Sequence, residues 1–105
     1  MKEISVQELK SWKENAKDFQ LIDVRDSYEY EWSNLNGESI SMANLLDNLN
    51  KINRTSDVVM YCNYGNRVAA IIDILEQKHG YTNLINLTGG YEDWCVEFEP
   101  QRLAY

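Results

Sequence analysis

Short apolar runs, each bounded by polar residues, recur along this chain. The clearest are residues 19–24 (FQLIDV), 57–61 (DVVMY) and 83–87 (NLINL), and a weaker one covers 39–42 (SISM). Runs of this length without a helical repeat are typical of strands that are buried on both faces of a sheet. The sequence therefore predicts four strands, of which 57–61 is the most strongly indicated.

Helical spacing of apolar residues fills the intervals between these runs. Ser5 and Glu8 match the capping box that begins many helices. Gly80 suits the C-terminal cap of a long helix. The predicted helices cover residues 6–12, 27–32, 45–52, 68–75 and 91–96.

The alternation of strands and helices predicts an α/β fold with a mostly parallel central sheet and helices on both faces. The sequence has no repeat, low-complexity tract or linker, so residues 1–105 are expected to form a single domain. Functional groups of such sheets gather at the carboxyl ends of the strands. Residues 23–25 and 61–67 are therefore expected on the same rim.

The charge balance narrows the range of partners. Ten Lys and Arg face 17 Asp and Glu, which gives a formal net charge of −7 and leaves no basic surface for nucleic acid. No apolar run approaches the roughly 20 residues of a membrane-spanning helix. The first twelve residues lack the apolar core of a secretion signal, so we expect a cytoplasmic protein without a membrane partner.

Few residues in the chain are suited to covalent chemistry. The single histidine is His79, and the two cysteines, Cys62 and Cys95, lack the spacing of a zinc site. A hydrolase would have to use His79 as its base. We expect both thiols to stay reduced, with Cys95 as a structural thiol or, less simply, as a resolving partner of Cys62. Any covalent chemistry in this protein is therefore expected to use a thiol.

Residues 62–67 (CNYGNR), here called the thiol loop, join the clearest strand to the longest helix. Backbone N–H groups in such a turn can point inward and, together with the helix dipole, stabilise an anion. Cys62 would be held there as a thiolate, Gly65 would allow the tight turn, and Arg67 would add a positive charge. The alternative is a cysteine that acts only as a small apolar residue at a strand end.

The thiol loop resembles the active-site loop Cys-x-x-Gly-x-Arg of the rhodanese family. Residues 21–26 (LIDVRD) resemble the family's Asp-Val-Arg signature, and 87–94 (LTGGYEDW) resemble its Gly-Gly…Trp segment. The three motifs occur in the family's order and span most of the chain. One segment departs from the pattern, because 34–38 (NLNGE) stands where the family commonly has His-Ile-Pro-Gly-Ala.

The resemblance implies a single rhodanese domain that transfers sulfane sulfur without a metal or cofactor. Cys62 would take sulfur from thiosulfate or a persulfide donor and pass it to cyanide or a thiol, such as that of a protein acceptor. Asp23 and Arg25 would support the loop, and the family pattern suggests an ion pair between Asp23 and Arg67. The residues expected to hold the persulfide are Asn63, Tyr64, Gly65, Asn66 and Arg67.

Three other functions stay open at this stage. Related phosphatases and arsenate reductases have five residues between Cys and Arg, whereas Cys62 and Arg67 have four between them. A persulfide carrier or a protein-interaction module would show little turnover. Residues 34–38 and the tail also resemble the rhodanese domain fused to adenylyltransferases that activate sulfur-carrier proteins, which suggests such a carrier as an acceptor.

Overall fold

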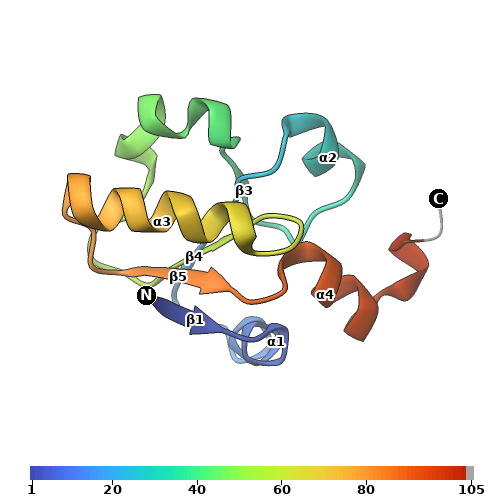
Figure 1. Cartoon of the computed structure of the whole chain (residues 1–105). Helices are drawn as coiled ribbons and strands as arrows, with labels where there is room; N and C mark the ends of the chain where they lie inside the picture. Colours follow the sequence, from blue (N-terminus) through green and yellow to red (C-terminus); the bar gives the residue numbers. More distant parts are fainter. Residues whose placement is uncertain (104–105) are drawn as a thin grey trace.

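Figure 1 shows the computed structural model, which describes residues 1–103; the last two residues of the predicted domain lie outside this range. A five-stranded sheet has the order β1-β5-β4-β2-β3, and all of its pairings are parallel. This confirms the predicted α/β fold. The strands are β1 (Lys2–Ile4), β2 (Gln20–Asp23), β3 (Glu38–Ser39), β4 (Val58–Tyr61) and β5 (Leu84–Leu87).

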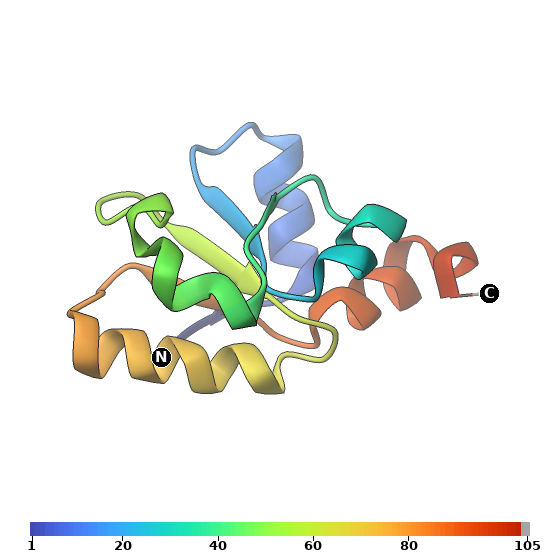
Figure 2. The ribbon, with the colours of Figure 1, turned by 90° about the horizontal axis from the view of Figure 1, so that it is seen from above.

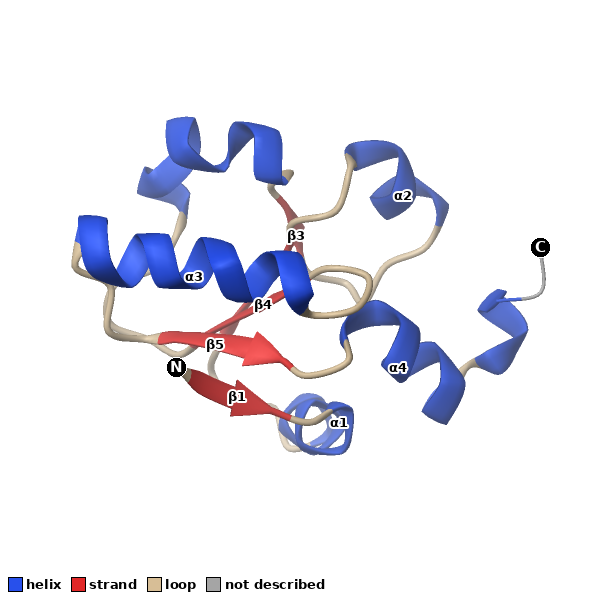
Figure 3. Ribbon diagram, in the orientation of Figure 1, coloured by secondary structure: helices blue, strands red, loops and turns tan. Residues whose placement is uncertain are grey.

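Helices cover both faces of the sheet, as predicted (Figure 3). The α-helices are α1 (Val6–Glu14), α2 (Ser27–Trp32), α3 (Asn66–His79) and α4 (Gly90–Phe98). Two 3₁₀ helices, η1 (Met42–Lys51) and η2 (Pro100–Leu103), complete the described chain. One buried cluster joins the sheet to α3 and η1, and a second joins its other face to α1 and α4.

The register of the two central strands explains where the thiol loop begins. β2 and β4 run side by side with Asp23 opposite Tyr61, so both strands end at the same edge of the sheet. Cys62 follows directly and leads into α3, whose N-terminus lies at that edge (Figure 1). The predicted rim of residues 23–25 and 61–67 is therefore present.

Alternation along β4 decides which way Cys62 faces. Successive side chains of a strand point to opposite faces. Met60 and Cys62 belong to the cluster under α3, whereas Val59 and Tyr61 belong to the cluster under α1 and α4. The thiol therefore lies on the α3 side of the sheet, beside the N-terminus of that helix.

At the carboxyl edge, α2 lies beside the start of α4 (Figure 2). No residue of α2 is fully buried, so this helix is a surface element that borders the rim. In residues 1–103, no helix is long and apolar enough to cross a membrane.

Candidate active site

Cys62 is almost completely buried, with 3% of its surface exposed, yet its sulfur meets a polar group. The backbone N–H of Gly65 donates a hydrogen bond to Sγ over 3.1 Å. No other loop amide in the described structure donates to this sulfur, so the predicted ring of N–H groups contacts Sγ at one point.

Gly65 makes this hydrogen bond possible because of its backbone conformation. Its φ of +93° lies in the left-handed region, where a side chain would be strained, and it forms the N-cap of α3. Asn66 and Arg67 are the first residues of that helix, so no helix carbonyl can accept from their N–H groups. The turn thus leaves donors and the positive end of the helix dipole beside the thiol.

A cavity of about 110 Å³ lies against this turn. It is lined by Cys62, Asn63, Tyr64, Asn66 and Arg67. The predicted loop residues are therefore gathered around one small space, with Gly65 bonded to the sulfur. Such a cavity has room for additional atoms on the thiol.

The first turn of α4 supports the loop from behind. The backbone N–H groups of Tyr91 and Glu92 donate to the carbonyl oxygens of Cys62 and Asn63, over 2.8 and 2.9 Å. Gly90 permits this approach, because a Cβ at that position would lie 2.8 Å from the carbonyl carbon of Asn63. The Gly-Gly segment thus acts on the thiol loop through the backbone.

Asp23 pairs with Arg25, and the predicted ion pair between Asp23 and Arg67 is wrong. The Arg25 guanidinium lies 2.8 Å from the Asp23 carboxylate, and both side chains are buried. Within residues 1–103 no ion pair joins Asp23 to Arg67, which is exposed in the first turn of α3. The reason is local: a residue two positions after Asp23 can wrap back onto its carboxylate at the strand end.

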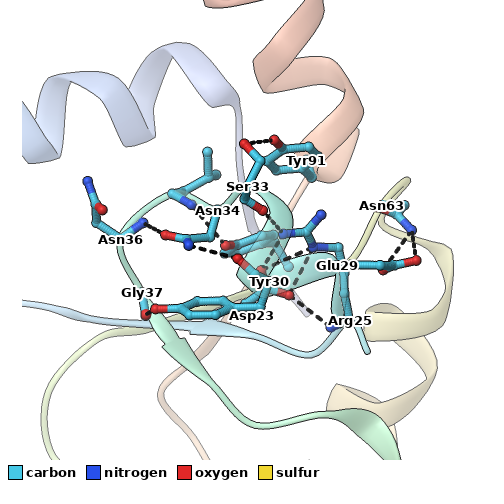
Figure 4. A network of polar contacts seen from close by, with 12 residues as sticks. Asp23, Arg25, Glu29, Tyr30, Ser33, Asn34, Asn36, Gly37, Asn63 and Tyr91 are labelled. Carbon is cyan, nitrogen blue, oxygen red and sulfur yellow. Dashed lines mark hydrogen bonds and ion pairs between the residues drawn. The ribbon is translucent and has the colours of Figure 1, made fainter. Parts of the chain in front are cut away.

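Arg25 holds several elements of the rim together (Figure 4). It donates to the carbonyl of Ser33 over 2.6 Å and stacks 4.1 Å from the centre of the Tyr91 ring, while Tyr91 donates to the Ser33 hydroxyl. Burial disfavours the charge on Arg25, but the hydrogen bonds and charge of Asp23 outweigh it and raise its pKa overall. Arg25 is therefore a structural cation.

A larger hollow of about 240 Å³ lies next to the thiol loop, between α2 and α4. It shares Asn63 and Tyr64 with the cavity at Cys62. Glu29 of α2 accepts a hydrogen bond from the Asn63 amide over 3.3 Å, and Glu92 of α4 also lines this space. We call this space the acidic hollow.

Sequence reasoning missed Asn86 as a contact of the thiol loop. This buried side chain of β5 donates to the carbonyl of Gly65 over 3.4 Å, while its own oxygen has no partner among the described residues. A polar residue in the middle of an otherwise apolar strand was the available signal, since buried amides need partners.

The other thiol lies on the opposite face of the sheet. Cys62 and Cys95 are both free, and Cys95 lies with no exposed surface in the cluster of α1 and α4. Burial raises the pKa of the Cys95 thiol. No group of three or more His, Cys, Asp or Glu residues that could hold a metal ion occurs within residues 1–103.

Comparison with known proteins agrees with this architecture. The chain is 29% identical over 105 residues to the probable adenylyltransferase/sulfurtransferase MoeZ of Mycobacterium tuberculosis, covering 97% of this chain but only 26% of that protein. It is 29% identical over 91 residues to the thiosulfate sulfurtransferase GlpE of Coxiella burnetii, covering 85% of this chain and 84% of that one.

Solved structures give the same result. A rhodanese-like domain protein from Staphylococcus aureus has a TM-score of 0.81 and 32% identity, covering 90% of this chain and 91% of that chain. A rhodanese-related protein from Thermoplasma volcanium has a TM-score of 0.78 and 28% identity, covering 95% and 96%. The family model of the rhodanese-like domain matches residues 5–97, almost the entire fold and the whole thiol loop. The chain therefore belongs to the rhodanese-like domain family.

Proposed function

We propose that this protein is a sulfurtransferase that carries sulfane sulfur as a persulfide on Cys62. The observation that carries the proposal is the Cys62 sulfur, which accepts a hydrogen bond from Gly65 and lines a small cavity at the start of α3. The similarity to GlpE, a thiosulfate sulfurtransferase that this chain matches over 84% of its length, supports the same activity.

The first step needs no proton transfer from a side chain. The Cys62 thiolate attacks the outer sulfur of thiosulfate, a new S–S bond forms, and sulfite leaves with the electron pair of the broken bond. A persulfide donor reacts in the same way and leaves as a thiolate. This suits a site in which the sole histidine, His79, lies at the far end of α3.

The loop then stabilises the product. The outer sulfur of a Cys62 persulfide carries the negative charge, and N–H groups at the start of α3 are fixed donors for it. Cyanide or a thiol removes that sulfur in the second step and returns the Cys62 thiolate. A sulfur-carrier protein is a further acceptor under this proposal.

Turnover of cysteine variants tests this function. With thiosulfate and cyanide, wild type and Cys95→Ala should form thiocyanate, while Cys62→Ser should form none because its oxygen cannot be converted into a persulfide. The same proteins are assayed with p-nitrophenyl phosphate. Thiocyanate formation by Cys62→Ser would overturn the proposal, and hydrolysis of the phosphate ester without thiocyanate formation would replace it with phosphatase chemistry.

A further inference from the structure

We propose that the acceptor of the Cys62 sulfur is a cysteine on a cationic protein segment, bound by the acidic hollow through Glu29 and Glu92. The inference rests on the proposed sulfurtransferase activity and names its partner class. The acidic hollow shares Asn63 and Tyr64 with the cavity at the thiol, so a segment seated there lies next to Cys62.

The charges around the thiol loop are mainly negative. Carboxylates of Glu29, Glu92 and Asp93 line the hollows that adjoin Tyr64, and none of them forms an ion pair within residues 1–103. Arg67 is the one cation at these hollows without a carboxylate partner in the described chain, since Arg25 is paired with Asp23.

At the acidic hollow this pattern favours a cationic side chain. The net charge of −7 on the whole chain adds to the field that attracts an approaching cation. A lysine or arginine gains attraction to both carboxylates. It also meets the ring of Tyr64, which is 65% exposed and offers a face for a cation.

The placement of the two carboxylates gives the partner a defined position. Glu29 comes from α2 and is held by the Asn63 amide, and Glu92 comes from the first turn of α4, so they border the hollow from two elements. A cysteine flanked by basic residues places its cations toward them and its thiol toward the cavity. Its thiolate attacks the outer sulfur of the persulfide, the Cys62 S–S bond breaks, and the Cys62 sulfur leaves as a thiolate.

Matched charge variants test the inference. Glu29→Gln/Glu92→Gln removes two charges at the hollow, and Glu31→Gln/Glu97→Gln removes two exposed charges from the same helices outside it. Each protein is loaded with thiosulfate, freed of excess donor and mixed with the peptides Gly-Lys-Cys-Lys-Gly or Gly-Glu-Cys-Glu-Gly. Thermal unfolding of each variant confirms that its fold is intact.

The readout is the ratio of sulfur-transfer rates to the lysine and glutamate peptides. Comparing this ratio between proteins cancels the intrinsic reactivity of each peptide thiol. We expect the ratio to fall roughly three- to tenfold in the hollow variant, as two partly exposed charge pairs allow. The control variant should match wild type, and high salt should lower the wild-type ratio toward that of the hollow variant.

Equal ratios in wild type and the hollow variant, or an equal loss in the control, would overturn the inference. Such a result leaves the sulfurtransferase proposal standing, because sulfur still moves from Cys62. Failure of the proposed function gives a different outcome, namely no sulfur on Cys62 after treatment with thiosulfate.

Discussion

Gly90 packs against the thiol loop, and its backbone φ is +62°. The packing leaves no room for a side chain at this position. A Cβ there would collide with the backbone of Cys62 and Asn63, which cannot move without displacing the thiol. Gly80, at the other end of α3, also has a positive φ of +71°, but its Cβ would come no nearer than 4.0 Å to Arg54. An alanine at Gly80 would therefore test backbone strain alone, whereas an alanine at Gly90 would add a steric clash to that strain.

We predict that Gly90→Ala lowers the rate of thiocyanate formation by more than tenfold. It should also reduce the free energy of unfolding by about 2–4 kcal/mol, since strain and collision add. Gly80→Ala should cost about 1 kcal/mol and leave the rate unchanged. Urea unfolding measures the free energy of unfolding of each variant, and the thiocyanate assay measures its rate. A Gly90→Ala protein with the wild-type rate would contradict the role given to α4.

The second prediction at the residue scale concerns the buried ion pair of Asp23 and Arg25. Asp23→Asn leaves the Arg25 cation buried without its carboxylate, so the free energy of unfolding should fall by about 3–5 kcal/mol. Glu14→Gln breaks the exposed pair with Lys10 and should cost less than about 0.5 kcal/mol. A loss below about 1 kcal/mol for Asp23→Asn, measured by urea unfolding, would refute this assignment.

At the scale of elements, the sequence indicated the strands with strong apolar runs, since β2, β4 and β5 lie inside the predicted ranges. The predicted strand 39–42 is wrong, because β3 is a two-residue edge strand, Glu38–Ser39, with exposed side chains, and η1 already begins at Met42. The sequence also missed β1. β1 has a single buried residue, Ile4, and exists because it pairs with β5 at the edge of the sheet. Such a pairing depends on a partner more than 80 residues away, which local patterns cannot contain.

Of the predicted helices, α2 has the predicted bounds, α1, α3 and α4 are longer than predicted, and the remaining one differs in type. The expected amphipathic helix over 45–52 is the 3₁₀ helix η1, which is interrupted by a non-helical φ of −129° at Asn48. α3 begins at Asn66, two residues before the first apolar position, because Gly65 caps it. Apolar spacing reports which face is buried, whereas backbone caps decide where a helix starts.

The capping box of α1 was predicted and is confirmed. Ser5 accepts from the Glu8 N–H over 3.1 Å, and Glu8 accepts in return from the Ser5 backbone. Ser5→Ala should lower the free energy of unfolding by about 1 kcal/mol in thermal unfolding experiments. The rate of sulfur transfer should not change, because α1 packs on the face opposite α3. A lowered rate would mean that α1 influences the thiol loop.

At the scale of the whole molecule, a buried tyrosine links stability to pH. Burial and the neighbouring Asp23 charge raise the pKa of Tyr61 far above its ordinary value near 10. The unfolded chain ionises this group above about pH 10 and the folded chain does not, so this contribution to stability is complete below pH 10 and declines above it. Between pH 9 and 11, wild type should lose about 1.4 kcal/mol more than Tyr61→Phe.

Urea unfolding at the two pH values measures this difference. Tyr61→Phe also loses the hydrogen bond that its hydroxyl accepts from Leu35, which shifts stability at both pH values by the same amount. An identical pH dependence of the two proteins would show that Tyr61 ionises equally in the folded and unfolded chains.

The location of the site could be predicted from the sequence, but most of the contacts within it could not. The strand ends that bring Asp23 near Cys62 follow from local patterns and the general geometry of parallel sheets. The partner of Asp23 and the supporting turn of α4 depend on side-chain direction and tertiary packing. The acidic hollow likewise brings together Glu29 and Glu92, which are far apart in sequence.

Mass spectrometry of the intact protein after treatment with thiosulfate tests the central claim most directly. Wild type and Cys95→Ala should each gain the mass of one sulfur atom, about 32 Da, and lose it on addition of cyanide, with peptide mapping locating the adduct on residue 62. Cys62→Ser should gain nothing. An adduct that persists in Cys62→Ser, or a wild-type protein that never gains sulfur, would contradict the account.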